Sequence, residues 1–306
     1  MITRPTVLIL GAGASKEFGF PVGRELLRLI CAELNTDSDT GLKDRLREQG
    51  FSPPYMGKFG RALQLSGEPS VDAFLEHRRE FVEIGKTSLA IKLIEREQED
   101  ALFANRLRPK DASWYEYLWT RMHGSFEDFS KNKLAVLTFN YDRSLEHFLF
   151  VALANAFGKS ASECTEALRT LSIIHLYGLL GDYPYTDAAG RPYRPNLTPN
   201  NIQKCVKGIR IVSEEVDRDP VFENASALLQ EAEIVCFLGF GFHRTNMERL
   251  RIGQSKRNPQ LYSTGFGLTN EEREVIKITA KSIWGTPIMF YEGEVHEALR
   301  DIPLFR

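Results

Sequence analysis

The stretch Leu-Ala-Val-Leu-Thr-Phe-Asn-Tyr-Asp, residues 134–142, joins an apolar run to a short polar segment. The run Leu134–Phe139 predicts a strand, and the pattern of Arg143–Phe157 predicts the helix that follows it. In open α/β sheets, ligands bind at the carboxyl ends of strands, where the chain turns towards a helix. Asn140 is therefore the first candidate for a functional residue.

Three other apolar runs also end in glycine or polar residues. They are Thr6–Leu10 before Gly11-Ala12-Gly13-Ala14-Ser15, Leu171–Ile174 before His175-Leu176-Tyr177-Gly178, and Ile234–Leu238 before Gly239-Phe240-Gly241-Phe242-His243. Two further strands are predicted at Leu261–Thr264 and Pro287–Tyr291. Because predicted strands alternate with predicted helices, the sequence indicates an α/β protein with a Rossmann-like, doubly wound parallel sheet.

The chain predicts a single domain, residues 1–306, with an insertion of loops and helices at residues 41–130. Within the insertion, we expect Gly41–Gly67 to be rich in loops because it contains glycines and a Ser-Pro-Pro run, and Val71–Met122 to be helical. Gly178–Ile209 predicts a hairpin or an ordered loop over the carboxyl edge of the sheet, with a turn at residues 187–190. Other helices are predicted from Pro21, as the first helical residue, to Leu34, and at Asp219–Glu231, Thr245–Leu250, Glu271–Ile283 and Glu294–Leu299.

The composition excludes several classes of function. With 39 basic and 41 acidic residues, the net charge of -2 gives no electrostatic case for binding nucleic acid. The apolar runs stay short of the roughly 20 residues that span a bilayer, and a strand follows the N-terminus without a signal peptide, so we expect a cytoplasmic protein without membrane contact. The cysteines are far apart, which predicts buried apolar side chains and no structural metal at Cys31, Cys164, Cys205 and Cys236.

Each motif taken alone also has a structural interpretation. Gly11-Ala12-Gly13 has the first two glycines of a phosphate-binding turn, but Lys16 stands where a dinucleotide fingerprint has its third glycine. The same run fits a tight turn without a ligand. Asn140 also fits a helix cap, and His175 also fits a strand-end histidine with satisfied hydrogen bonds.

Taken in order, the motifs resemble those of sirtuins over nearly the whole chain. Sirtuins carry a GAGxS run, a G-[IF]-P segment, a TQNxD run, an HG pair and a late glycine-containing loop. The corresponding stretches here are Gly11-Ala12-Gly13-Ala14-Ser15, Gly19-Phe20-Pro21, Thr138-Phe139-Asn140-Tyr141-Asp142, His175 with Gly178, and Gly239-Phe240-Gly241. The chain looks like the divergent prokaryotic sirtuin-like branch of antiphage defence.

The departures from the sirtuin pattern are also informative. Phe139 replaces the glutamine of TQN, HG has become His-Leu-Tyr-Gly, and the proline-rich stretch Gly181–Pro199 stands in place of the four-cysteine zinc module. These differences weaken the protein-deacylase interpretation. The resemblance instead implies a domain that hydrolyses NAD itself without zinc. It also implies a homo-oligomer and a regulatory partner protein, such as an ATPase or a phage sensor.

The chemistry of that reaction suggests roles for the site residues. The nicotinamide of NAD departs without a strong general acid, so the site must stabilise an oxocarbenium-like ribose and position a water. Asn140 is expected to hold a ribose hydroxyl or that water, His175 to accept a proton near pH 7, and Asp142 to orient nicotinamide or balance the developing positive charge. The cofactor-binding residues implied are Gly11, Ala12, Gly13 and Ser15 at the pyrophosphate, Pro21 in the G-[IF]-P segment, and Gly239, Gly241 and Asn246 near the adenine ribose.

Two other functions stay open from the sequence. An NAD-dependent protein deacylase would need a groove for an acyl-lysine peptide beside His175. A non-catalytic sensor would bind NAD or ADP-ribose in the same cleft and signal to a partner. The fold alone does not separate these functions.

Overall fold

The computed structural model describes residues 1–103, 113–122, 124–184, 186–211, 219–255 and 257–304. Six parallel strands form one sheet in the order β3-β2-β1-β4-β5-β6, which confirms the predicted fold class. The strands are β1 (Thr6–Leu10), β2 (Leu134–Thr138), β3 (Ser172–His175), β4 (Ile234–Leu238), β5 (Gln260–Thr264) and β6 (Ile288–Tyr291). β1, β2 and β4 are buried along their whole length, because helices cover both faces of a doubly wound sheet.

The strand order reverses beside β1. The chain builds β1, β2 and β3 outwards in one direction and then places β4 on the other side of β1. Leu10 pairs with Thr138 of β2 and with Leu238 of β4, so these three strands end level with one another. The carboxyl ends of the strands at such a reversal are the usual ligand site of this fold.

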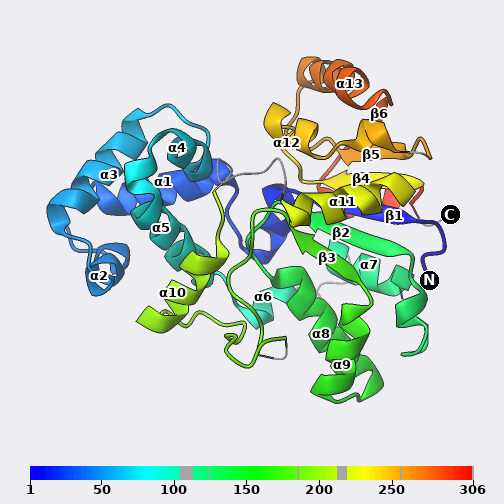
Figure 1. The fold of residues 1–306 in the computed structure, drawn as a ribbon, viewed down its shortest axis with the longest axis horizontal. Coiled ribbons are helices and arrows are strands. Elements are labelled where there is room, and N and C mark those ends of the chain that lie inside the picture. Colours follow the sequence, from blue (N-terminus) through cyan, green and yellow to red (C-terminus); the bar gives the residue numbers. More distant parts are fainter. Residues whose placement is uncertain (104–112, 123, 185, 212–218, 256, 305–306) are drawn as a thin grey trace.

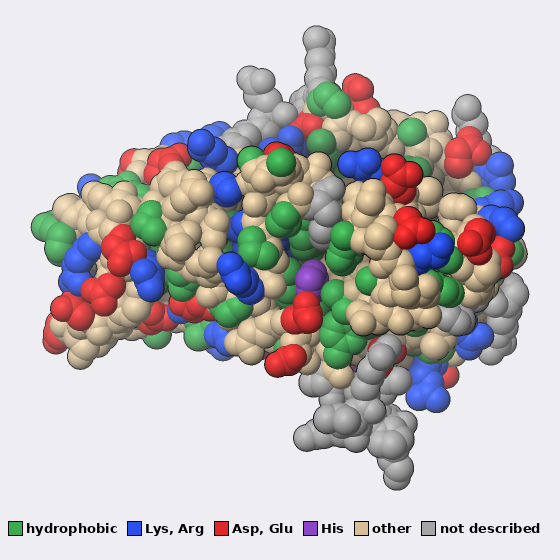
Figure 2. All heavy atoms as spheres, turned by 90° about the horizontal axis from the view of Figure 1, so that it is seen from below, with side chains coloured by type: hydrophobic (Ala, Val, Ile, Leu, Met, Phe, Trp, Pro, Cys, Tyr) green, Lys and Arg blue, Asp and Glu red, His purple; other side chains and the backbone are tan. Residues whose placement is uncertain are grey.

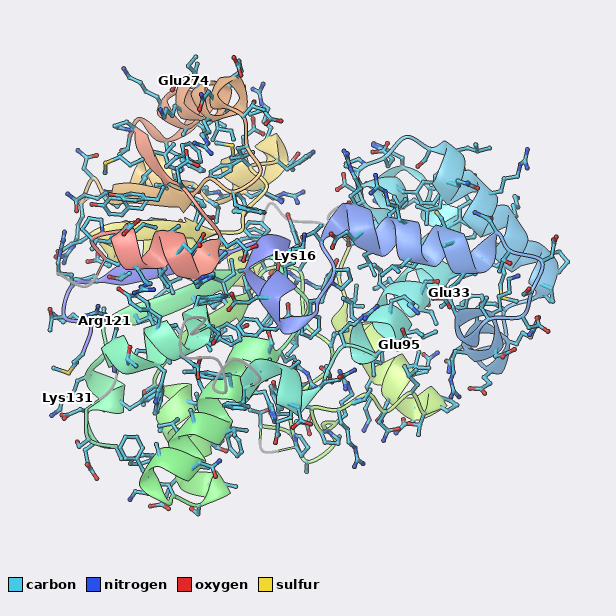
Figure 3. The ribbon with its side chains drawn as sticks, turned by 180° about the vertical axis from the view of Figure 1, so that it is seen from behind. Lys16, Glu33, Glu95, Arg121, Lys131 and Glu274 are labelled. Atoms are coloured by element: carbon cyan, nitrogen blue, oxygen red, sulfur yellow. The ribbon has the colours of Figure 1, made fainter. Side chains whose placement is uncertain are left out.

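Helices cover the two faces of the sheet. In Figure 1, α11 (Pro220–Glu231) crosses in front of the central strands. On the opposite face, seen in Figure 3, α14 (Val295–Asp301) packs beside α7 (Trp114–Met122). The other helices around the sheet are α6 (Glu99–Phe103), α8 (Ser144–Phe157), α9 (Ala161–Arg169), α12 (Arg244–Arg249) and α13 (Asn270–Trp284). Short 3-10 turns occupy η1 (Ala12–Phe18), η2 (Arg79–Phe81), η4 (Phe129–Lys131) and η5 (Ile252–Gln254).

A helical lobe projects to one side of the sheet (Figure 1). It contains α1 (Gly23–Leu34), α2 (Gly41–Glu48), α3 (Pro53–Leu65), α4 (Val71–His77), α5 (Val82–Ile94) and α10 (Pro199–Gly208). Within the lobe, α1 packs on α3 and α5 packs on α10. The predicted helical character of Val71–Met122 is confirmed for its described part, and residues 104–112 lie outside the described residues. The boundaries 41–130 of the insertion stay a prediction.

The expectation of loops at Gly41–Gly67 is wrong, because two helices occupy most of this segment. Thr40 caps the first of them, its side chain accepting a hydrogen bond from the N–H of Lys43 at 3.3 Å. Pro53 and Pro54 occupy the first turn of the second helix, where a missing N–H costs no hydrogen bond. A Ser-Pro-Pro run that suggested a loop is therefore a helix start.

Two smaller expectations also need correction, and one helix was not predicted at all. Gly178–Ile209 forms one isolated antiparallel bridge between its end residues and contains α10, so it is not a hairpin. The turn predicted in it is present, with the N–H of Gly190 donating to Asp187 at 2.7 Å. Pro21 precedes the N-cap Val22 and is not the first helical residue. The sequence analysis also missed α9, although Ser160 and Glu163 form its capping box.

The cysteines are as expected: Cys31, Cys164, Cys205 and Cys236 are all buried and free. In the described part of the chain, no helix combines the length and the apolar character needed to cross a membrane. The face of the molecule in Figure 2 carries acidic and basic side chains in alternation, without a broad area of one sign.

Candidate functional site

The loops after β1 and β4 touch at the reversal of strand order. The N–H of Gly13 donates to the carbonyl of Gly239 at 3.0 Å. A Cβ on Gly11 would lie 2.5 Å from the oxygen of Gly239, and a Cβ on Gly239 would lie 2.2 Å from the nitrogen of Ala14. Gly239 also has a φ of 57°, a conformation that favours glycine. The two loops can therefore approach this closely only with glycine at these positions.

Several backbone amides of the first glycine turn already have partners. The N–H of Gly11 donates to Leu238 at 3.0 Å, and the N–H of Ala14 donates to Gly11 at 2.9 Å. The N–H groups of Gly11 and Gly13, which the sequence analysis assigned to a pyrophosphate, are therefore both occupied. The glycines thus serve first to join the two loops, and the contact of their amides with a phosphate stays a prediction.

Asn140 connects the end of β2 to this turn. Its Nδ2 donates to the carbonyl of Gly11 at 2.9 Å and to Oγ of Ser15 at 3.0 Å. Oγ of Ser15 donates in turn to Oδ2 of Asp142 at 2.7 Å. The N-cap position of α8 is Arg143, so Asn140 does not cap that helix. The structure therefore excludes the capping interpretation of Asn140 and joins three predicted site residues in one polar chain.

Asp142 is held by protein groups on both carboxylate oxygens. Its Oδ1 accepts hydrogen bonds from the N–H of Ser144, at 3.2 Å, and from the Ser144 hydroxyl. Burial raises the pKa of Asp142, although the hydrogen bonds from Ser144 and Ser15 act in the opposite direction. Since its side chain is buried in this arrangement, contact with nicotinamide stays a prediction.

His175, the last residue of β3, has both ring nitrogens occupied. Nδ1 lies 2.8 Å from the carbonyl oxygen of Asn140, and Nε2 lies 2.5 Å from Oε1 of Glu146. A carbonyl oxygen can only accept, so Nδ1 carries a proton, and the contact at Nε2 pairs the ring with the carboxyl group of Glu146. Burial lowers the pKa of His175, but Glu146 and the Asn140 carbonyl outweigh it and hold the pKa above its usual value. In this conformation His175 positions Asn140 and offers no free nitrogen as a base.

A cavity of about 590 Å³ opens beside the two glycine loops. Its volume falls in the range of roughly 300–1,000 Å³ that is typical of ligand pockets. Four predicted cofactor-binding residues line it: Ala12, Gly13, Gly239 and Gly241. The sequence analysis missed the other side chains that give the cavity its character, which are Lys16, Glu17, Thr264, Phe266, Leu268, Glu294 and Val295. Figure 3 places Lys16 on η1, at the junction of the sheet and the helical lobe.

The remaining predicted residues lie outside the wall of this cavity. Ser15 is buried behind the turn. Pro21 lines a neighbouring open groove of about 560 Å³ that shares Lys16 with the cavity. Asn246, in α12, accepts a hydrogen bond from the hydroxyl of Tyr177 at 2.6 Å. The structure thus brings the glycine loops together at one site and places Pro21 and Asn246 at its periphery.

Glu17 is the titratable group of the cavity with the most altered environment. Its side chain is 18% exposed, and its Oε1 accepts the N–H of Trp114 at 3.0 Å. Burial raises the pKa of Glu17 to about 7; the Trp114 hydrogen bond lowers it, while the charges of Glu294 and Glu116 raise it further. At neutral pH this carboxyl group therefore exchanges between its acid and its anion.

Glu17→Gln is expected to change how stability depends on pH. The pKa of Glu17 is about 7 in the fold, against its ordinary value of 4.5. The folded state therefore binds the extra proton between these values, and its unfolding free energy falls as pH rises through them. From pH 5 to pH 8, the free energy of unfolding should fall by about 2 kcal/mol less for the variant than for the parent. This figure is reduced to account for the 18% exposure of the side chain. Urea denaturation at the two pH values measures this difference.

Glu25→Gln is the matched control, since its pKa shifts in the opposite direction. The N–H of Val22 and the side chain of Lys16 lower the pKa of Glu25. Its contribution to stability is therefore present at high pH and lost as pH falls, and this variant should be less stable than the parent at pH 8. Equal pH profiles for parent and Glu17→Gln would contradict the assignment to Glu17.

A second cavity, of about 420 Å³, lies on the other side of His175. Its polar wall includes Glu146, Arg169 and Asp182, and its apolar wall includes Leu168 and Ile173. The cavity beside the glycine loops does not include His175 in its wall. The imidazole ring therefore borders a different space from the one that the glycine loops border.

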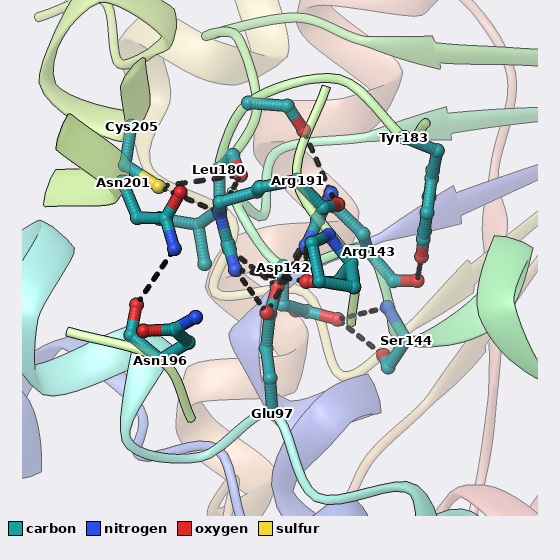
Figure 4. Close-up of polar contacts among 12 residues, drawn as sticks. Glu97, Asp142, Arg143, Ser144, Leu180, Tyr183, Arg191, Asn196, Asn201 and Cys205 are labelled. Carbon is teal, nitrogen blue, oxygen red and sulfur yellow. Dashed lines mark hydrogen bonds and ion pairs between the residues drawn. The ribbon is translucent and has the colours of Figure 1, made fainter. Parts of the chain in front are cut away.

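A buried ionic cluster fixes the chain next to Asp142 (Figure 4). Glu97 accepts hydrogen bonds from Arg143 at 2.9 Å and from Arg191 at 2.5 Å, and the three side chains are at most 1% exposed. Arg143 also donates to the carbonyl of Gly181 at 3.0 Å. The cluster thus ties the segment after α5, the start of α8 and the proline-rich stretch to one another, directly beside the polar chain of Asn140.

Comparisons with known proteins leave the family open. The chain matches none of the protein-family models that were searched, and no curated protein matches it significantly. The resemblance to sirtuins therefore stays a prediction from the motifs. Within the described residues, no group of three or more His, Cys, Asp or Glu side chains is arranged to hold a metal ion.

Proposed function

We propose that this chain binds NAD at the reversal of strand order and hydrolyses it to nicotinamide and ADP-ribose. The observation that carries the proposal is the pair of hydrogen bonds from Asn140 Nδ2 to Gly11 and Ser15. They hold an uncharged carboxamide against the turn whose residues Ala12 and Gly13 line the larger cavity. No hydrogen bond among the described residues uses Oδ1 of Asn140, so this oxygen can accept one from a ribose hydroxyl or a water.

The reaction needs little acid catalysis. The bond between ribose C1′ and the nicotinamide nitrogen breaks, and both of its electrons go to that nitrogen, which becomes neutral. A water then adds to C1′ and releases one proton. The demand on the protein is to orient the ribose and the water and to stabilise the positive charge that develops at C1′. Asn140 supplies an oxygen dipole for this purpose, and the anionic form of Asp142 would lower the energy of that charge.

His175 acts in this proposal by holding the backbone of Asn140. Its Nδ1 contact with the Asn140 carbonyl fixes the direction in which the carboxamide side chain leaves the main chain. Acceptance of the released proton by His175 would first require separation of Nε2 from Glu146. The role of a proton acceptor, expected from the sequence, therefore demands a rearrangement of this pair.

The resemblance of the motifs also leads to a proposal about how the activity is controlled in the cell. Unrestrained hydrolysis of NAD would harm the cell that contains the enzyme, so the proposal includes control by self-association or by a regulatory partner, as in antiphage defence.

A second candidate function, NAD-dependent deacylation of a protein, is favoured by one observation. The cavity of about 420 Å³ beside His175 has apolar walls from Leu168, Leu171 and Ile173, which suit an acyl chain. NAD hydrolysis remains the better-supported function, because it requires only the site at the glycine loops.

The experiment that separates these functions uses the purified full chain with NAD, with and without an acetyl-lysine peptide. Nicotinamide and ADP-ribose are quantified by chromatography. Hydrolysis predicts that both products appear in equal amounts without the peptide. Release of nicotinamide only with the peptide, together with transfer of the acetyl group, would identify a deacylase. Binding of NAD without release of nicotinamide in either mixture would contradict both enzymatic functions.

A further inference from the structure

The larger cavity has three chemically different parts. The glycine loops form one wall, with Lys16 as the basic residue among the lining side chains. Phe266 and Leu268, after β5, form an apolar wall, and Phe266 is 63% exposed. Glu17 on η1 and Glu294 before α14 supply two carboxyl groups. Both residues line this one cavity, and the charge of Glu294 contributes to the raised pKa of Glu17.

These parts match the adenosine half of a dinucleotide. A flat base is suited to the apolar wall, because aromatic side chains stack on planar rings. The 2′- and 3′-hydroxyls of the ribose donate hydrogen bonds, and carboxylates accept them. Rossmann-type sites use an acidic residue in this way to bind the ribose of NAD, whereas a positive residue accommodates a 2′-phosphate. Here the uncharged Asn140 follows β2, and the carboxyl groups of the cavity come from η1 and from the residue before α14.

Lys16 does not offset this acidic character at the carboxylates. Its Nζ pairs with Oε1 of Glu25 at 3.2 Å, outside the lining of the cavity. The imidazole of His296 is 3.9 Å from Oε2 of Glu17, beyond hydrogen-bonding distance. A 2′-phosphate between Glu17 and Glu294 would therefore meet two carboxyl groups, while the lysine of the cavity wall is paired with Glu25 and the His296 ring stays 3.9 Å from Glu17.

Building on the proposed function, we infer that Glu17 and Glu294 hold the adenosine ribose diol and make the site select NAD over NADP. The same two side chains bind the diol and repel the 2′-phosphate, so they determine specificity and take no part in breaking the nicotinamide bond.

The test measures binding by calorimetry with two ligands that lack nicotinamide and cannot be hydrolysed at that bond, ADP-ribose and 2′-phospho-ADP-ribose. The parent chain should bind ADP-ribose at least about 10-fold more tightly than 2′-phospho-ADP-ribose. Glu294→Gln should reduce this preference several-fold, mainly by improving the binding of the phosphorylated ligand. Glu274→Gln is the control and should keep the preference of the parent, since Glu274 lies on α13, outside the lining of the cavity and apart from Lys16 in Figure 3.

The outcomes distinguish this inference from the proposed function. Equal affinity for the two ligands, or a preference unchanged in both Glu294→Gln and Glu17→Gln, would overturn the specificity role while NAD hydrolysis stands. Hydrolysis of NAD without measurable binding of ADP-ribose would also overturn it, since the adenosine half would not be held here. Absence of both ligand binding and NAD hydrolysis would reject the proposed function itself.

Discussion

Asn140→Ala is expected to lower the rate of NAD hydrolysis by about 10²–10³-fold, the usual cost of losing one oriented polar group from a reacting site. The carboxamide is the only part of the side chain that joins β2 to the glycine turn, through Gly11 and Ser15. Alanine removes both these hydrogen bonds and the oxygen proposed to meet the ribose or the water. Initial rates of nicotinamide release at saturating NAD measure the effect on kcat.

The control for this variant is Asn155→Ala on α8. Asn155 is exposed, and its Nδ2 donates to the carbonyl of Val151 at 2.8 Å. This variant should hydrolyse NAD at the parent rate. Thermal unfolding of the two variants should show that both are folded at the assay temperature. A folded Asn140→Ala protein with the parent rate would reject Asn140 as a catalytic residue and would leave it a structural link between two loops.

Glu97→Ala is expected to lower the free energy of unfolding by about 3–5 kcal/mol, because it leaves two buried guanidinium groups without their carboxylate. Arg143 and Arg191 are at most 1% exposed, so solvent cannot replace the lost partner without a rearrangement. Urea denaturation at neutral pH measures the loss. Because the cluster lies beside Asp142, the same variant should also hydrolyse NAD more slowly than the parent. This decrease in rate should exceed the decrease in the fraction of folded protein.

Glu48→Ala gives the comparison with an exposed ion pair. Glu48 contacts Arg45 at 2.9 Å, and both side chains are at least 40% exposed. Pairs of this kind contribute under about 1 kcal/mol, since water solvates each charge well. A loss for Glu97→Ala no larger than for Glu48→Ala would show that the buried cluster does not stabilise the fold.

Local patterns were sufficient to locate the sheet. All six strands lie close to their predicted bounds, because each is an apolar run that ends in a glycine, a polar residue or a turn. Local patterns failed for proline, because proline is common both in loops and in the first turn of a helix. Pro53 and Pro199 stand at helix starts, in segments whose other residues suggested loops. Whether such a proline lies in a loop or starts a helix depends on whether the residues after it form a helix that packs in the lobe.

The candidate site was likewise only partly predictable from the sequence. The sequence indicated Asn140 and the glycine runs, since each lies directly after a strand. It gave no signal for Glu17 and Glu294, which are 277 residues apart by number and follow strands that are not neighbours in the sheet. They line the same cavity because α14 returns from the edge strand β6 to pack near β5 and α7.

The sequence by itself therefore determined the α/β class, the six strands and the strand ends that carry polar chemistry, because these depend on neighbours in the chain. Only the tertiary structure decided that Asn140 bonds to the glycine turn, that His175 is held by Glu146, and that Glu97 pairs with two distant arginines. These contacts depend on the order of the strands and on the return paths of the helices. The physical reason is that hydrogen bonds and charges act over a few ångströms, so their partners are set by packing between segments that no local pattern relates.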